Sequence, residues 1–344
     1  MINIKTKFGR LALLIMALIL VGGQSSAQKR ASDALVSSKA DKYLSSLSRD
    51  GLFSGSVLLA REGRVILSKG YGMANLEYAV PNTPQTKFLL ASVTKAFTAV
   101  AIMMLHERGR LDINDSICKY VEQCPAMWQA VKLRHLLNHT SGITEFGKPQ
   151  PENDCFRRTP MTTAQAVERA KQFTPDFTPG EKFAYSSVAF VLLGHVIEKV
   201  SGQSYEDFLR ANIFEPLKMT GTGRYRQKQI TGQRAAGYAR AGDGSLSNFD
   251  YFNPDYIFAA GSLYSTVEDL YLWSEALHAG KVVGRGTLEQ MFTPGLESTG
   301  YGWEIFTRKN RRLIRADGRS FGFSNSIATY PSERLTVIVL GNID

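Results

Sequence analysis

The stretch ASVTKAFTAVAIMMLHERG, residues Ala91 to Gly109, combines an apolar helix with one charge that does not suit it. No residue from Ala96 to Leu105 is charged, so the segment predicts a helix that is apolar on all sides and belongs in the middle of a protein. The predicted helix runs from Ser92 to Arg108 and ends at a C-capping glycine. Lys95 nevertheless sits in its first turn, three residues after Ser92. An ammonium group in that place needs a chemical reason.

Residues three apart share a face of a helix, so Ser92 and Lys95 present a hydroxyl and an amine side by side. Desolvation favours the neutral form of an amine, which can then accept a proton from the hydroxyl. The N-terminus of the helix adds backbone N–H groups, which suit the oxyanion formed when a serine attacks a carbonyl. In the alternative interpretation, Ser92 only caps the helix and Lys95 reaches the surface. The four-residue pattern S-x-x-K does not decide between the two by itself.

The N-terminus predicts a secretory signal peptide over residues 1–27. Three basic residues precede an apolar run over 11–21, and small residues at 25–27 suit cleavage. The run is too short to span a bilayer comfortably, and no later segment reaches about 18 apolar residues. We therefore expect a periplasmic or secreted protein with no stable membrane anchor after cleavage. Removal of residues 1–27 lowers the formal net charge from +10 to +7.

The remaining positive charge is scattered and does not indicate a nucleic-acid partner. Only Arg308–Arg312, RKNRR, forms a basic cluster. It lies between two strand-like segments without interleaved aromatic residues, so we expect a solvated hairpin tip there and no nucleic-acid site. A hydrophobic content of 44% over 344 residues is ordinary for a globular protein with a large core.

The cysteines and histidines do not indicate a metal or another cofactor. His135 and His139 are spaced like a helical metal pair, but no third ligand is evident, so we expect packed histidines. Export would bring Cys118, Cys124 and Cys155 into an oxidising compartment. A bridge between Cys118 and Cys124 is one option, although sequence alone does not assign the pairing.

Hydrophobic periodicity places strands at both ends of the chain and helices between them. Residues 54–72 are typical of a hairpin that turns at Glu62–Gly63, and the last third contains four consecutive antiparallel strands. We therefore expect an α/β (α+β) fold in which both chain ends form one antiparallel sheet, flanked by helices. The sheet domain is expected over 28–109 and 255–344, with a mainly helical insertion over 110–254. The site would lie in the cleft between them.

A second motif appears in FTPGEKFAYSS, residues 177–187, where Tyr185 stands just before an apolar helix. With SVTK at 92–95 and YSS at 185–187, the chain resembles the β-lactamase-related serine hydrolases, the superfamily of class C β-lactamases, DD-peptidases, D-amino-acid peptidases and certain carboxylesterases. The resemblance covers nearly all of residues 35–344 and takes in LRHLLNHTSGI (133–143), IFEPLKMTGTG (213–223), AAGSLYSTVEDLYLW (259–273) and GFSNSIATYP (322–331).

The resemblance implies a β-lactamase/transpeptidase-like fold and a role for each matching residue. Ser92 is expected to be the nucleophile and Lys95 its proton acceptor. Tyr185 is expected to relay the proton to the leaving group and later to help activate the hydrolytic water. The oxyanion hole is expected to combine the backbone N–H groups of Ser92 and Arg319. Such sites need no metal. The residues expected to contact substrate are Ser187, Asp317 and Gly318.

Two positions depart from the pattern of the family. The second motif is usually Tyr-x-Asn, but here the third residue is Ser187, whose hydroxyl is shorter and offers fewer hydrogen bonds. The third motif is usually Lys-x-Gly or His-x-Gly, and here it aligns with Ala316-Asp317-Gly318. In the family that cation helps to orient the tyrosine and to bind a substrate carboxylate. On a strand, Arg315 and Arg319 point to the face opposite Ala316, so neither replaces it.

The sequence thus predicts an exported serine hydrolase that forms an acyl-enzyme on Ser92 and hydrolyses an amide or ester, such as a peptide, a β-lactam or a small ester. Ala316 motivates the alternative of a catalytically impaired relative that binds peptides or wall fragments. A carboxylesterase is a third interpretation. The family usually closes with a helix after the last strand, whereas this sequence stops at VIVLGNID, through either loss of the helix or truncation at Asp344. The sequence does not define the oligomeric state.

Overall fold

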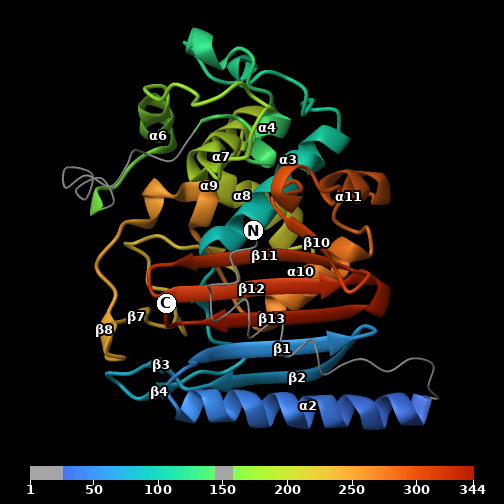
Figure 1. Cartoon of the computed structure of the whole chain (residues 1–344). Coiled ribbons are helices and arrows are strands. Elements are labelled where there is room, and N and C mark those ends of the chain that lie inside the picture. Colours follow the sequence, from blue (N-terminus) through green and yellow to red (C-terminus); the bar gives the residue numbers. More distant parts are fainter. Residues whose placement is uncertain (1–25, 144–157) are drawn as a thin grey trace.

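A computed structural model describes residues 26–143 and 158–344, with the side chains of 26–30 left aside. Its centre is a six-stranded antiparallel sheet in the order β10-β11-β12-β13-β1-β2 (Figure 1). Strands from both ends of the chain therefore form one sheet, and the predicted fold class is confirmed. The strands are β1 (Gly55–Arg61), β2 (Arg64–Tyr71), β10 (Glu304–Arg308), β11 (Arg311–Ser320), β12 (Phe323–Tyr330) and β13 (Leu335–Gly341).

Two tight turns and one long-range pairing fix the order of the strands. The predicted turn at Glu62–Gly63 joins β1 to β2, and both residues have positive φ, 54° and 76°. The basic cluster is a hairpin tip as predicted, because Lys309 and Asn310 turn between β10 and β11 with φ of 48° and 58°. Such turns match the twist of an antiparallel pair. β1 pairs with β13 along its length, from Gly55↔Gly341 to Arg61↔Leu335.

One face of the sheet packs on the apolar helix recognised in the sequence, which is α3 (Thr94–Glu107). Every residue of α3 from Thr94 to Leu105 is buried, as expected for a helix that is apolar on all sides. Phe97 stacks on Trp273 with ring centroids 3.7 Å apart, and Trp273 stacks in turn on Trp303 at 5.5 Å. Aromatic contacts of this kind connect α3 to α10 (Val267–His278) and to the loop before β10.

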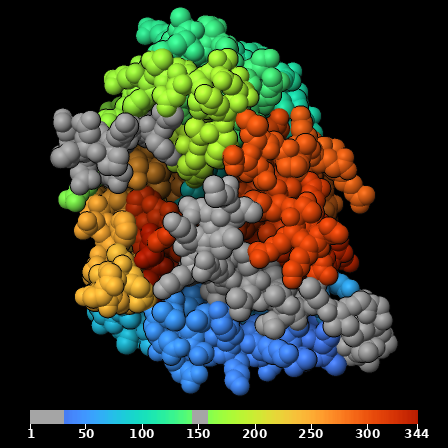
Figure 2. Space-filling view, in the orientation of Figure 1, coloured from blue at the N-terminus to red at the C-terminus, as the bar shows by residue number. Residues whose placement is uncertain are grey.

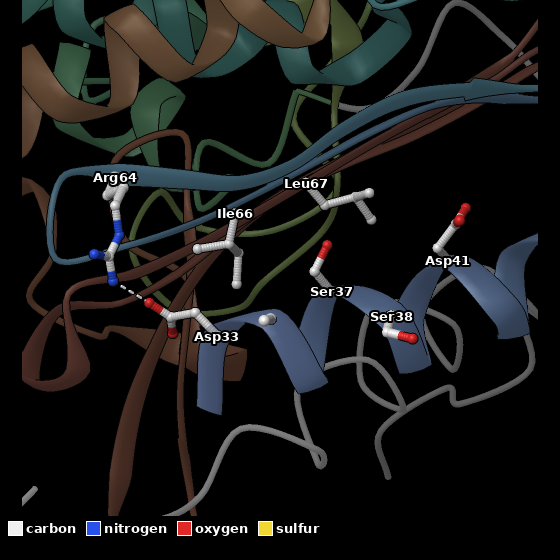
Figure 3. Close-up of a pocket in the computed structure, with 8 residues that line it drawn as sticks. Asp33, Ser37, Ser38, Asp41, Arg64, Ile66 and Leu67 are labelled. Carbon is white, nitrogen blue, oxygen red and sulfur yellow. Dashed lines mark hydrogen bonds and ion pairs between the residues drawn. The ribbon is translucent and has the colours of Figure 1, made fainter. Parts of the chain in front are cut away.

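The opposite face carries α2 (Ser26–Arg49), which lies along β2 (Figure 1). Its buried residues Val36, Ala40 and Leu44 recur at helical spacing and join a second apolar cluster with the sheet. Asp33 forms ion pairs with Arg61 and Arg64 at the tip of the β1–β2 hairpin, and Figure 3 shows Asp33 and Arg64 pointing toward each other. A groove of about 560 Å³ remains between α2 and β2.

The middle of the chain is mainly helical, and it lies above the sheet in the view of Figures 1 and 2. The structure also has several short strands in and around this part of the chain, which the sequence did not predict. The helices are α4 (Leu133–Leu137), α6 (Thr163–Ala170), α7 (Ser187–Ser201), α8 (Tyr205–Leu209), α9 (Phe258–Gly261), α10 (Val267–His278) and α11 (Arg285–Met291). The short strands are β3 (Met73–Asn75), β4 (Val80–Pro81), β5 (Phe88–Leu89), β6 (Gly223–Arg224), β7 (Tyr238–Arg240), β8 (Leu246–Asn248) and β9 (Leu263–Ser265).

Cys118 and Cys124 form a disulfide with Cα atoms 5.2 Å apart, which settles the pairing that the sequence left open. Cys155 and residues 1–25 of the predicted signal peptide lie outside the described residues. Within residues 26–143 and 158–344, every helix is too short or too polar to cross a membrane.

Candidate active site

Ser92 stands on a short turn between β5 and α3. Residues Ala91–Val93 form a 3₁₀ turn and α3 begins only at Thr94, so the expected helical start at Ser92 is wrong by two residues. Ala91 has φ of +48°, an unusual backbone conformation for a residue with a side chain. The turn is held by β5, which pairs with β9, and by the Leu90 N–H, which donates to Leu263 O.

Lys95 is buried, with only 4% of its surface exposed. The interpretation in which it reaches the surface is therefore wrong. Its Nζ donates to Ser92 Oγ at 3.0 Å and to the backbone oxygen of Ala260 at 2.9 Å. One turn further along α3, Thr98 Oγ1 donates to Ala259 O at 2.6 Å. These bonds from α3 to α9 fix the amine beside the serine hydroxyl.

Tyr185 brings a third polar group to the same point. Its Oη lies 2.6 Å from Ser92 Oγ, and its ring centroid lies 4.9 Å from Lys95 Nζ. Tyr185 comes just before α7, whose N-cap Ser186 accepts from the Ala189 N–H. The tyrosine is 45% exposed, so the group that contacts Ser92 also faces the solvent side of the site.

His139 packs against the ring of Tyr185. The sequence had predicted only that His139 is a packed histidine. Its ring stacks on the Tyr185 ring with centroids 4.5 Å apart. Nδ1 accepts from the Ser186 N–H at 3.0 Å, so the ring proton of the neutral imidazole is on Nε2. Burial lowers the pKa of His139 to about 3, and Lys95 contributes to the shift. His139 therefore lines the site as an uncharged imidazole.

β11 closes the other side of Ser92. Gly318 packs directly on the Ala91–Val93 turn: a Cβ there would lie 2.2 Å from Leu90 O and 2.9 Å from Ser92 N. Arg319, the next residue, has an exposed side chain that pairs with Asp344, away from the turn. Only a glycine allows this approach of two backbones, and it sets the distance between Ser92 N and the strand.

The side chain of Asp317 is engaged elsewhere, although the residue borders the site. Its carboxylate accepts from Ser326 Oγ at 2.7 Å and lies 3.2 Å from Arg315 Nε. Burial raises the pKa of Asp317 to about 6, although Arg315 opposes the shift. Arg315 also pairs with Glu304, with Nε 3.0 Å from Oε2. As strand alternation predicts, neither guanidinium replaces the missing cation at Ala316.

A cavity of about 70 Å³ lies beside the three polar groups. Ser187 begins α7 and is not part of the lining, so its expected contact with substrate is without support from this cavity. Sequence reasoning missed the residues contributed by the loop before β10, because no motif marks them. The lining consists of Ser92, Lys95, His139, Phe183, Tyr185, Thr299, Gly302, Trp303, Glu304, Arg315, Ala316 and Asp317.

The part of the chain that the structure describes holds no group of three His, Cys, Asp or Glu residues placed to bind a metal ion. His135 Nδ1 accepts from the Lys132 N–H at 3.2 Å, whereas the ring of His139 stacks on Tyr185, so the two histidines have different partners. What the arrangement offers is a hydroxyl within hydrogen-bond distance of both an amine and a phenol. These are the parts needed to activate a serine by proton transfer.

Comparison with known proteins gives consistent results. A family model described as Beta-lactamase matches residues 37–344. The relative PbpX of Bacillus subtilis (strain 168) is 30% identical over 296 residues, which cover 85% of this chain and 71% of PbpX. The solved structure of a penicillin-binding protein from Bacillus halodurans has a TM-score of 0.77 at 26% identity, covering 87% of this chain and 94% of that one. A D-stereospecific amidohydrolase from Streptomyces sp. has a TM-score of 0.74 at 25% identity, covering 89% and 94%.

The close approach of Gly318 predicts that Gly318→Ala destabilises the protein. The added methyl group meets backbone atoms that no side-chain rotation can move, so we expect a loss of about 1–3 kcal/mol in the free energy of unfolding, measured by urea denaturation. Gly286→Ala is the matched control, because Gly286 lies in α11 with no other atom within 4 Å of the new Cβ. It should stabilise the helix by up to about 1 kcal/mol. Equal stability of Gly318→Ala and the wild type would contradict the packing described.

The buried histidines predict that the protein loses stability in acid. Burial lowers the pKa of His135 and His278 to about 4 and that of His139 to about 3. In the unfolded chain each titrates near about 6.5, so below that pH the unfolded state binds more protons and the free energy of unfolding falls. Each histidine contributes at most about 1.4 kcal/mol per pH unit, in the window between its folded and unfolded pKa values.

Asp317 has the opposite effect on the free energy of unfolding, because its pKa is raised to about 6 and the folded state takes up its proton at a higher pH than the unfolded chain does. Its contribution offsets that of one histidine. The net effect of the four groups is still a loss of stability as the pH falls. Urea denaturation at several pH values measures the slope. His139→Gln should reduce it by about 1.4 kcal/mol per unit. A variant with an unchanged slope would show that His139 is not held neutral.

Proposed function

The chain belongs to the Beta-lactamase family of serine hydrolases, and from that premise we propose that it is an exported hydrolase that forms an acyl-enzyme on Ser92 and cleaves an amide or ester. The observation that carries the proposal is the position of Ser92 Oγ, 3.0 Å from Lys95 Nζ and 2.6 Å from Tyr185 Oη. Both Lys95 Nζ and Tyr185 Oη therefore lie close enough to Ser92 Oγ to exchange a proton with it.

Acylation uses the lysine as the base. Neutral Lys95 accepts the proton of Ser92 Oγ while that oxygen bonds to the carbonyl carbon, and the carbonyl electron pair moves to its oxygen. When this tetrahedral intermediate collapses, the bond to the leaving nitrogen or oxygen breaks. The leaving group takes a proton from Tyr185 Oη, which is replenished by the proton held on Lys95.

Deacylation reverses these roles with water as the attacking group. Water bonds to the acyl carbon and gives a proton to Tyr185 Oη, whose own proton passes to Lys95. The acyl bond to Ser92 Oγ then breaks, the serine regains a proton, and a carboxylic acid leaves. The exposed Tyr185 hydroxyl suits this step, because it borders both Ser92 and the side from which water arrives.

The proposed oxyanion hole consists of the backbone N–H groups of Ser92 and Arg319. It is supported by the contact of Gly318 with the nucleophile turn, which brings the strand that carries Arg319 next to Ser92. Two preorganised N–H donors at the developing negative charge are worth about 10²–10³ each in kcat for acyl transfer. Only the backbone of Arg319 is needed, in agreement with the distant position of its side chain.

We propose a small-molecule or peptide substrate, without a cofactor. The Bacillus halodurans protein is named as penicillin-binding and the Streptomyces protein as a D-stereospecific amidohydrolase, which makes β-lactams, D-peptides and D-amino acid amides the first compounds to try. Small esters are equally compatible with the chemistry, so a carboxylesterase is a variant of the same proposal. Ala316 favours a second candidate, a relative that binds peptides or wall fragments without turning them over.

Acylation of Ser92 separates these candidates. The protein is incubated with a fluorescent penicillin and with p-nitrophenyl acetate, and the adduct is located by mass spectrometry. We expect a covalent adduct on Ser92 and ester turnover, both reduced at least about 10³-fold in Ser92→Ala. Ser38→Ala, at an exposed site on α2, is the control and should behave as the wild type. Absence of any adduct with either reagent would favour the binding protein.

Export is proposed from residues 1–27 and is tested by the N-terminus of the mature protein. Expression of the full chain in a Gram-negative host should yield a periplasmic protein that begins at Gln28, as read by N-terminal sequencing. Replacement of Leu14 and Ile15 by aspartate breaks the apolar run and should leave the uncleaved precursor inside the cell. An uncleaved wild-type chain would contradict the proposal.

A further inference from the structure

We infer that the substrate of the proposed acyl transfer carries no carboxylate next to its scissile bond, and that an uncharged ester or carboxamide occupies this place. The inference rests on the proposed function and concerns the cavity beside Ser92, Lys95 and Tyr185. The charged side chains that line this cavity, and the partners that they already have, support it.

The amine of Lys95 and the guanidinium of Arg315, the two basic side chains in the lining besides His139, are both engaged. Lys95 Nζ donates to Ser92 Oγ and to Ala260 O, and the proposed chemistry needs it as a proton acceptor. Arg315 pairs with Glu304 and with Asp317, and its guanidinium carbon lies 5.2 Å from the centroid of the Phe306 ring. A substrate carboxylate would have to displace one of these partners to gain a counter-ion.

The third basic group in the lining, the imidazole of His139, is uncharged. It is buried, its Nδ1 is occupied by the Ser186 N–H, and its ring lies against Tyr185. Burial opposes protonation of this imidazole, and so does the nearby amine of Lys95. Ala316, at the same side of the site, has no polar atom in its side chain. The described lining therefore provides no free positive charge.

Negative charge, by contrast, is present at the border of the cavity. Glu304 and Asp317 both border it, and although the carboxylate of Asp317 is held by Ser326 and Arg315, the two acids share the single guanidinium of Arg315. The side chain of Glu304 is 43% exposed, so a molecule bound in the cavity can approach it. A carboxylate that loses its water without meeting a cation is strongly disfavoured, and like charges nearby add to the penalty.

The rest of the lining suits an uncharged group. Ala316, Gly302 and the ring of Trp303 leave room on the side where a long basic residue would stand, and Thr299 adds a hydroxyl-bearing side chain. The methyl group of an ester or the amide of a carboxamide needs no counter-ion in such surroundings. Lack of charge at this end of the substrate then determines which acyl donors react.

Two substrate pairs that differ only in this charge test the inference. The first pair is N-acetyl-D-alanyl-D-alanine and its C-terminal amide, and the second is the ester of N-acetyl-D-alanine with D-lactate and with D-lactamide. We expect kcat/KM of the wild type to be at least about 10-fold higher for the neutral member of each reactive pair, since an unpaired buried group costs at least this much. Equal rates, or a preference for the acid, would overturn the inference.

Variants at Ala316 provide the matched control. Ala316→Lys adds a cation where the lining has none, so it should raise kcat/KM for the acid relative to the neutral member at least about 10-fold. Ala316→Met adds similar length without charge and should leave the wild-type preference in place. A shift of the same size in both variants would show that space, not charge, sets the preference, and would overturn the inference.

Failure of the inference and failure of the proposed function give different results. If the acid members react faster, Ser92 is still an acylated nucleophile and only the assignment of the substrate end is wrong. If neither pair reacts and p-nitrophenyl acetate leaves no adduct on Ser92, the proposed function fails and the inference falls with it.

Discussion

The site depends on the buried amine of Lys95, which donates hydrogen bonds to two oxygen atoms. Lys95 is surrounded by an apolar helix and its neighbours, where an ammonium group without partners would cost several kcal/mol. Ser92 Oγ and Ala260 O receive its hydrogen bonds, and the second oxygen belongs to α9, far away in the sequence. The packing of α9 on α3 and α7 is thus also the condition for a lysine in this place. Stability of the core and reactivity of the serine share one set of contacts.

The elements that the sequence predicted are those with a strong local pattern. The apolar run after Lys95, the turn at Glu62–Gly63 and the four strands of the last third depend on period and turn chemistry, and the structure has them within a few residues. The short strands β5, β6 and β9 were missed because two or three residues have no period. They form only because the folded chain places them together. The pairing of β1 with β13 followed from strands at both ends, not from any local signal.

For the site, spacing brought Ser92 and Lys95 together, whereas Tyr185 was placed only by resemblance to a family. The position of Ala316 could be read from the sequence, but its surroundings could not, because Thr299 and Trp303 come from a loop without a motif. Histidine spacing drew attention to His139 without showing that it stacks on Tyr185. The carboxylate of Asp317 was expected at the substrate and is instead held by Ser326 and Arg315, since partners across a sheet are invisible to a single strand.

The pairing of β1 with β13 also determines when the surroundings of Ser92 are complete. Gly318 and the strands β11 to β13 are synthesised more than two hundred residues after the Ala91–Val93 turn on which Gly318 packs. Contacts so distant in sequence form late, because the loop between them must be closed first. A nascent chain that already contains the serine and the lysine therefore still lacks the wall that completes their surroundings. The surroundings of Ser92 and Lys95 are therefore complete only after the strand that carries Gly318 has been synthesised and has paired with its neighbours in the sheet.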